Sequence, residues 1–182
     1  EMGKICGTCH QKNIDCPGHF GHLNLARPVY HYHFINQIPK ILKCVCFNCS
    51  KLLIDESNNS IKNILSKPPK ARFNLIYEQC QKIKRCGEHN IDGCGYKQPD
   101  RYKVSNIEGI QAKWTKLDVS EANSSDIKTQ LLKIEQVKSI LEKITDEDCN
   151  HIGLSNVWCR PEWLICSVLP IPPPSVRPSV KQ

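Results

Sequence analysis

The residues with the clearest chemistry are cysteines and histidines near the start of the chain. Their order is Cys6-x2-Cys9-x6-Cys16-x2-His19. Two ligands separated by two residues on a tight turn can reach one ion, and two such pairs complete the closed tetrahedron of a structural zinc site. Pro17 and Gly18 supply the turn of the second pair. The pattern predicts a zinc site in which His10 and His22 compete with His19 for the fourth position.

A second group of cysteines begins in the stretch CVCFNCSKLL. Cys46 and Cys49 have the same turn spacing, whereas Cys44, one residue from Cys46, would point to the other face of an extended segment. The completing pair should come from RCGEHNIDGCGYKQP, which offers Cys86 and Cys94. Four thiolates leave no open coordination position, so the ion would brace the fold without doing chemistry.

The remaining cysteines have no partner at turn spacing, and we expect them to be small buried hydrophobic residues. They are Cys44, Cys80, Cys149, Cys159 and Cys166. His31 and His33 alternate on a predicted strand and could hold a metal on one face, although exposed or hydrogen-bonded rings are the commoner outcome. A zinc hydrolase would need an open metal position and a general base, and neither HExxH nor a comparable pairing occurs.

The composition favours metal over disulfides. The 182 residues include 12 cysteines, and no stretch approaches the roughly 18 apolar residues of a membrane span. The opening residues EMGK lack the apolar core of a signal peptide, which favours a reducing, intracellular compartment. Because the chain starts almost directly on a cysteine motif and ends in prolines, we expect it to be a piece of something longer.

Positive charge is concentrated with the cysteine motifs. Residues 1–117 carry 18 Lys and Arg against 9 Asp and Glu, within a net charge of +7 for the whole chain. This balance suits a polyanion such as nucleic acid, and it equally suits a solvated surface. The candidates to face phosphates are Lys40, Lys43, Lys51, Lys67, Lys70, Arg72, Lys82, Lys84 and Arg85.

The hydrophobic pattern predicts an irregular α+β fold with little regular sheet. A strand follows residue 22 and ends near Ile35, a short helix or turn covers INQIPKILKC, and helices cover SIKNILSK and ARFNLIYEQCQKIK. A hairpin over 102–119 turns near residues 106–109. A long amphipathic helix then places Ile127, Leu131, Ile134, Val137, Leu141 and Ile144 on one face, with Ser124 or Ser125 as its N-cap.

The end of the chain, RPEWLICSVLPIPPPSVRPS, forces an extended polyproline-like path at Pro170 and at 172–174. Because Trp163, Leu164 and Ile165 lead into it, we expect this segment to pack on the body of a protein. Together with CGTC, CPGHFGHLNLARPVYH, CVCFNCSKLL and GCGYKQP, it resembles the N-terminal clamp region of the largest subunit of multisubunit DNA-directed RNA polymerases. The resemblance spans nearly the whole chain and covers the eukaryotic, archaeal and large-DNA-virus types.

The resemblance implies two structural zinc ions. One would be held by Cys6, Cys9, Cys16 and His19, and the other by Cys46, Cys49, Cys86 and Cys94. It implies a clamp-head-like module that closes over DNA and the DNA–RNA hybrid, with the second-largest subunit and clamp-binding factors as further partners and no membrane contact. The family's Mg²⁺-binding NADFDGD motif is absent from this chain, so catalysis would belong to the rest of the subunit. The location would be the nucleus for a cellular enzyme, or the host cytoplasm and virion for a viral one.

Two features depart from cellular nuclear enzymes: the loop from Cys86 to Cys94 is short, and Lys, Asn and Ile are abundant, as in a divergent or viral homologue.

We expect five segments: the first zinc segment and strand (1–35), a helical segment with the second site (36–98), the hairpin (99–119), the amphipathic helix and a packed segment (120–169), and the proline-rich connection (170–182). The alternative is a free-standing zinc ribbon that binds nucleic acid or protein.

Overall fold

The computed structural model describes residues 3–54, 59–89, 92–105, 109–115 and 128–178. It divides into two compact units, residues 1–28 with 166–182, and residues 29–165. The fold is mixed α+β with small sheets, as the sequence predicts. The five segments expected from the sequence stay a prediction. Within the described residues, no helix is both long and apolar enough to cross a membrane.

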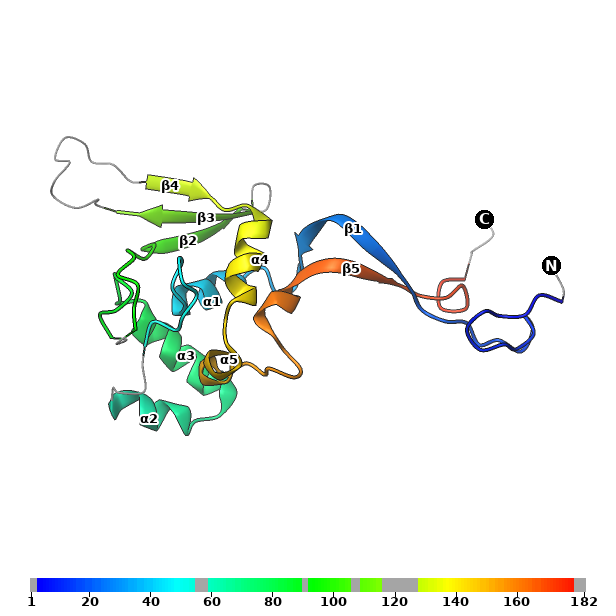
Figure 1. Cartoon of the computed structure of the whole chain (residues 1–182), viewed down its shortest axis with the longest axis horizontal. Coiled ribbons are helices and arrows are strands. Elements are labelled where there is room, and N and C mark those ends of the chain that lie inside the picture. The colour runs from blue at the N-terminus through cyan, green and yellow to red at the C-terminus, as the bar shows by residue number, and fades with distance from the viewer. Residues whose placement is uncertain (1–2, 55–58, 90–91, 106–108, 116–127, 179–182) are drawn as a thin grey trace. The chain divides into compact units, whose positions relative to one another are not determined.

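Strand β1 (Gly21–Tyr30) pairs with β5 (Ile165–Ile171) in a two-stranded sheet (Figure 1). The strand expected after residue 22 is therefore present, but it ends at Tyr30 and not near Ile35. The pairing of β5 with β1 was not expected from the sequence. Pro170 is compatible with this pairing because both strands of a two-stranded sheet are edge strands, in which alternate backbone N–H groups face away from the partner strand.

Residues 31–37 form turns, which corrects the prediction that His31 and His33 alternate on a strand. The backbone N–H of Phe34 donates to the carbonyl of His31 at 2.9 Å, and this bond folds the chain back on itself. The Nδ1 atom of His31 accepts from the backbone N–H of His33 at 3.3 Å. The His31 ring also stacks on Tyr32, with centroids 5.4 Å apart. The two imidazoles are thus held by local hydrogen bonding and stacking, and not on one strand face.

Three short helices follow in the predicted places: α1 (Ile38–Cys44), α2 (Asn59–Leu65) and α3 (Pro69–Cys80). A proline in the first turn of α1 and of α3 presets the backbone angle without losing a helical hydrogen bond. Helix α3 packs against both α1 and α2. Ile76 and Cys80, one helical turn apart on α3, are buried in these contacts.

The predicted hairpin consists of β2 (Arg101–Ser105) and β3 (Gly109–Trp114), which pair antiparallel. Its expected turn lies largely at 106–108, outside the described residues. Every second residue of β3, namely Ile110, Ala112 and Trp114, is buried, because alternate side chains of a strand face the same side. A third strand, β4 (Lys128–Leu131), pairs with β3 and completes the sheet in the order β2-β3-β4.

The long amphipathic helix is the main error of the sequence prediction. Helix α4 covers only Ile134–Glu142, because residues 128–131 belong to β4. The backbone N–H of Leu132 donates to the carbonyl of Ile110 at 2.9 Å. Because this N–H bonds to β3, it is not available for the bond to residue 128 that a helix would require. The N-cap position is occupied by Lys133, while Ser124, Ser125 and Ile127 lie outside the described residues. Val137 and Leu141 still face the core as predicted.

Two elements after α4 were not predicted: α5 (Asp146–Ile152) and the 3-10 helix η1 (Pro161–Leu164). The Thr145 hydroxyl caps α5 by accepting from the backbone N–H of Asp148 at 3.1 Å. The helix ends at Gly153, whose φ of 95° is the left-handed conformation that glycine adopts readily. Arg160 joins these elements, since its guanidinium bonds to Asp146 on α5 and to Glu162 on η1.

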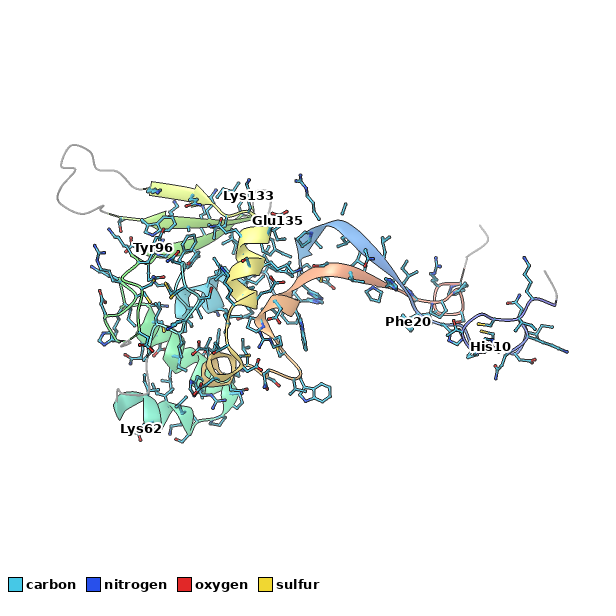
Figure 2. All side chains as sticks on the ribbon, in the orientation of Figure 1. His10, Phe20, Lys62, Tyr96, Lys133 and Glu135 are labelled. Carbon is cyan, nitrogen blue, oxygen red and sulfur yellow. The ribbon has the colours of Figure 1, made fainter. Side chains whose placement is uncertain are left out.

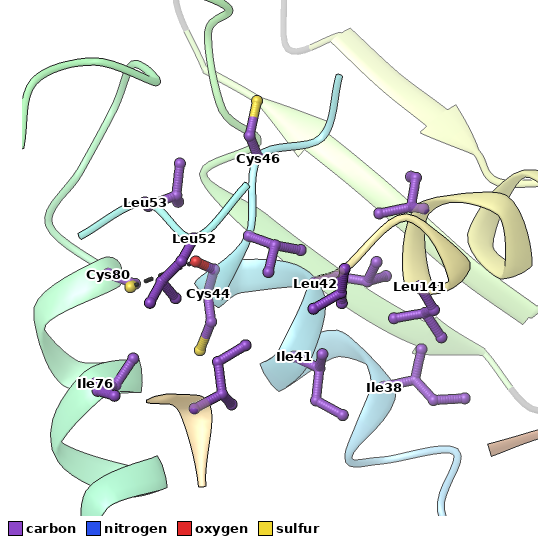
Figure 3. Packing of buried hydrophobic residues seen from close by; sticks show 14 of the residues in the cluster. Ile38, Ile41, Leu42, Cys44, Cys46, Leu52, Leu53, Ile76, Cys80 and Leu141 are labelled. Atoms are coloured by element: carbon purple, nitrogen blue, oxygen red, sulfur yellow. Dashed lines mark hydrogen bonds between the residues drawn. The ribbon is translucent and has the colours of Figure 1, made fainter. Parts of the chain in front are cut away.

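The buried core of residues 29–165 lies between α1, α3, α4 and the sheet (Figure 3). Cys44 and Cys80 are fully buried within it, as predicted, and the Cys80 thiol donates to the Cys44 carbonyl at 3.6 Å. Cys149 is also buried. Cys159 is exposed, so the expectation of a buried small residue is wrong there. It lies in a turn closed by its own N–H on the Ser155 carbonyl.

The cap of α5 can be tested by substitution. Thr145→Ala removes the acceptor for the Asp148 N–H, and we expect it to lower the free energy of unfolding by about 1 kcal/mol. Thr145→Ser keeps the hydroxyl and should stay near wild type. Urea titrations followed by tryptophan fluorescence measure both variants, and equal losses for Ala and Ser would contradict the capping role.

Candidate metal centres

Two groups of four side chains bring their ligand atoms together, and they are the two groups that the sequence spacing singles out. The first is Cys6, Cys9, Cys16 and His19, and the second is Cys46, Cys49, Cys86 and Cys94. Within each group all four ligand atoms lie within 4.8 Å of one another. Figure 2 shows sulfur atoms, in yellow, beside the labelled His10.

The spacing of the ligand atoms fits a tetrahedral zinc ion. Zn–S bonds of about 2.3 Å place two sulfurs about 3.8 Å apart across a tetrahedron, and a sulfur and a nitrogen about 3.5 Å apart. The Sγ atoms of Cys9 and Cys16 are 3.7 Å apart, and those of Cys49 and Cys86 are 3.8 Å apart. The Cys16 Sγ to His19 Nε2 distance is 3.5 Å. A disulfide would require about 2.05 Å, and every cysteine is free.

The two Cys-x2-Cys turns share one backbone design. In the first, Cys6 N–H donates to the Gln11 carbonyl at 2.9 Å, and in the second Cys46 N–H donates to the Lys51 carbonyl at 2.8 Å. The residue two positions after each leading cysteine directs its N–H at that cysteine's sulfur at 3.4 Å. These bonds hold both thiols of a turn on one side of the backbone, ready to share an ion.

The residue after each second cysteine bends the chain back by adopting positive φ. His10 has φ of 57° and Ser50 has φ of 62°, the two such non-glycine residues in the described part of the chain. Each N–H donates to the carbonyl of the leading cysteine at 2.9 Å. His10 is therefore a turn residue, and its ring is not among the four grouped ligands. This backbone role was not visible in the sequence.

The Cys86–Cys94 pair repeats this turn around a longer loop. Gly95 takes the positive-φ position at 73°, its N–H donates to the Cys86 carbonyl at 3.0 Å, and Cys86 N–H donates to the Tyr96 carbonyl at 3.0 Å. The loop closes where Gly93 approaches Gly87 so closely that a Cβ on Gly93 would lie 2.2 Å from the Gly87 Cα. The glycines flanking Cys94 and Cys86 thus allow one turn design at two loop lengths.

The Cys16–His19 half of the first group is built differently. Gly18, at φ of 87°, makes the turn, and a Cβ there would lie 2.7 Å from the Cβ of Pro173. The Ser175 hydroxyl donates to the Pro17 carbonyl at 3.4 Å. The proline run at the end of the chain therefore packs directly on the turn that carries two ligands. The sequence indicated a packed segment but gave no sign of where it packs.

A thiol with a lowered pKa occurs in each group. The backbone N–H groups of Cys9 and Thr8 lower the pKa of Cys6 to about 6. Burial opposes ionisation of Cys94, but the Tyr96 N–H and the neighbouring thiols lower its pKa to about 7. Burial raises the pKa of Cys46 and of Cys86. The lowered pKa values favour the thiolate forms of Cys6 and Cys94, and the thiolate is the form that binds a cation.

One buried amide contacts the second group. The Nε2 atom of Gln98 donates to the Sγ of Cys46 at 3.2 Å, and the side chain is only 2% exposed. Sequence reasoning missed this residue, since a glutamine between Lys97 and Pro99 carries no pattern that marks a metal neighbour.

The predicted phosphate-facing residues divide into two sets. The exposed ones are Lys51, Lys67, Lys70, Lys82, Lys84 and Arg85, while Lys40 and Arg72 are half-buried. Lys43 is buried, which excludes it from such a surface. Its Nζ donates to the Pro99 carbonyl at 2.7 Å, and burial lowers its pKa. Helix α1 packs against β2, and Lys43 stabilises the fold through its hydrogen bond to Pro99.

Comparisons with known proteins identify the family of this chain. A family model described as RNA polymerase Rpb1, domain 1, matches residues 1–182, and the chain belongs to this family. It is also 44% identical over 189 aligned residues to the DNA-directed RNA polymerase II subunit RPB1 of Euplotoides octocarinatus. That match covers 99% of this chain and 38% of the relative. The resemblance to the polymerase largest subunit is confirmed.

The packing of Pro173 on Gly18 gives a test within the first group. Gly18→Ala adds a Cβ at positive φ against Pro173. We expect this strain to weaken the free energy of zinc binding at the first group by about 1–2 kcal/mol. Zinc transfer to a chromophoric chelator should then be roughly tenfold faster for one equivalent. Gly7→Ala is the matched control, because nothing lies within 4 Å of its added Cβ. Equal rates for the two variants would contradict the packing role.

Proposed function

We propose that the two groups hold structural Zn²⁺ ions, with Cys6, Cys9, Cys16 and His19 as one ligand set and Cys46, Cys49, Cys86 and Cys94 as the other. The observation that carries this proposal is the tetrahedral spacing of the ligand atoms in each group. Each set fills all four positions with protein ligands. Zinc so bound braces the fold and activates no water.

We further propose that the chain is the clamp of an RNA polymerase largest subunit and has a clamp-head-like fold. In this role it closes over DNA and the DNA–RNA hybrid during transcription. Family membership over residues 1–182 supports this proposal, and it disfavours the alternative of a free-standing zinc ribbon. The activity would be that of a nucleotidyltransferase, supplied by the complete polymerase, since this chain carries no NADFDGD motif for Mg²⁺.

The partners follow from this role. The template and the hybrid would meet the exposed basic residues Lys51, Lys67, Lys70, Lys82, Lys84 and Arg85 through phosphates, without reading bases. The second-largest subunit and clamp-binding factors would contact other faces. The similarity to the polymerase II subunit of Euplotoides octocarinatus supports a cellular enzyme in the nucleus, while a viral enzyme would work in the host cytoplasm and virion.

Metal stoichiometry tests the zinc proposal. We expect elemental analysis to find two zinc ions per chain in protein purified without added metal. Cys46→Ser should remove one of them, because three ligands and a hydroxyl hold zinc poorly. Cys44→Ala is the matched control, since its sulfur points away from that of Cys46 (Figure 3), and it should keep two. Near-zero zinc in the unchanged protein, with oxidised thiols, would refute the proposal.

Salt dependence tests the contact with phosphates. Binding of duplex DNA should weaken as salt rises, with a log–log slope of about −0.9 for each phosphate neutralised. Replacing both Lys82 and Lys84 with glutamine should reduce that slope by about 2. The matched control replaces Lys133 and Lys143, which are exposed at the two ends of α4. A slope that is zero, or that falls equally in both pairs, would contradict the proposed surface.

A further inference from the structure

Gln98 is one of three buried polar or charged side chains in the described part of the chain. It lies on the segment that leads from the second cysteine group to β2, and its side-chain polar atoms bond to Cys46 and to the backbone of residues beside the cysteines. The side-chain N–H groups donate to Cys46 Sγ at 3.2 Å and to the Tyr96 carbonyl at 2.8 Å. The side-chain oxygen accepts from the backbone N–H of Phe47 at 2.8 Å. A buried amide so fully satisfied has a single stable position.

These partners fix which end of the amide meets the sulfur. The Phe47 N–H can only donate, so it requires the oxygen of Gln98. The Tyr96 carbonyl can only accept, so it requires the nitrogen. Turning the amide over would set donor against donor and acceptor against acceptor. The group aimed at Cys46 Sγ is therefore an N–H donor.

Cys46 is a buried ligand candidate that needs such a donor. It is fully buried, whereas Cys94 in the same group is exposed. A buried thiolate lacks the water that would stabilise its charge, and N–H donors replace that solvation. Cys46 Sγ accepts from the Asn48 backbone N–H at 3.4 Å in addition to Gln98.

Gln98 also joins the two halves of the group. Its side chain bonds to Phe47 within the Cys46–Cys49 turn, while its backbone N–H donates to the Lys84 carbonyl at 2.7 Å, two residues before Cys86. The two ligand pairs are thus bridged by protein hydrogen bonds independently of any ion.

We propose that Gln98 is an outer-sphere positioning residue of the second metal site, which donates a hydrogen bond to the Cys46 thiolate and holds the two ligand pairs in register. This inference rests on the proposed zinc function. It goes further because Gln98, which is not a ligand, would influence both the electronic environment of one ion and the rate at which that ion dissociates. Outer-sphere partners of metal ligands commonly change metal affinity by about 10–100-fold when they are replaced.

The test uses the full chain loaded with ¹¹³Cd, whose NMR frequency reports the donor set of each ion. The four-sulfur site and the three-sulfur, one-nitrogen site should give two separate resonances, so the first group serves as an internal control. Gln98→Glu keeps the volume and the acceptor for Phe47 but removes the N–H donor. Gln79→Glu makes the same charge change on an exposed part of α3.

In Gln98→Glu we expect the four-sulfur resonance alone to move, and one of two zinc ions to transfer to a chelator about 10–100-fold faster. Gln98→Met, which removes the donor without adding a charge, should move the same resonance. Gln79→Glu should match the unchanged protein.

Unchanged four-sulfur resonance and transfer rates in Gln98→Met would overturn the assignment of Gln98, even if Gln98→Glu failed to fold. Equal movement of both resonances would overturn it as well, since a general loss of structure would then be the cause. Failure of the unchanged protein to take up either metal would instead overturn the zinc function on which the inference rests.

Discussion

The structure depends on a turn in which backbone N–H groups point at cysteine sulfur. Such a turn puts two thiols on one side of the chain at the separation that a tetrahedral ion requires. It occurs at Cys6–Cys9, at Cys46–Cys49 and, around a longer loop, at Cys86–Cys94. The chain closes each turn with an isolated β-bridge, between Ile5 and Lys12, Val45 and Leu52, and Arg85 and Lys97. The same backbone turn therefore occurs in both cysteine groups.

Much of the remaining architecture can be understood as support for these turns. In residues 29–165, α1 leads directly into the Cys46–Cys49 turn, and α3 is followed closely by Cys86. The core between these helices and the sheet fixes where both ligand pairs begin. In the other unit, Pro173 packs on Gly18 in the turn between Cys16 and His19. Each cluster is thereby tied to segments far away in the sequence.

Two buried polar side chains, Gln98 and Lys43, form hydrogen bonds near the second cysteine group. Gln98 and Lys43 both lie next to Pro99 in space or in sequence, and each satisfies a backbone group that the sheet and the helices leave unpaired. Leaving such a group unpaired in the interior would cost about 1–3 kcal/mol. The Gln98 side chain thus ties the Cys46–Cys49 turn to the segment that leads into β2, and the Lys43 side chain ties α1 to the same segment.

The sequence by itself determined both ligand groups, because two-residue spacing on a tight turn is a local property that needs no tertiary context. It also determined α1, α2, α3 and the hairpin, whose prolines and alternating apolar residues act within a few positions. Only the tertiary structure decided that residues 128–131 join β3 as a strand, since the apolar spacing there fits a helix equally well and the partner lies elsewhere in the chain. Three further features depend on contacts between segments distant in the sequence, which no local pattern encodes. They are the burial of Lys43, the hydrogen bond that Gln98 donates to Cys46, and the packing of Pro173 on Gly18.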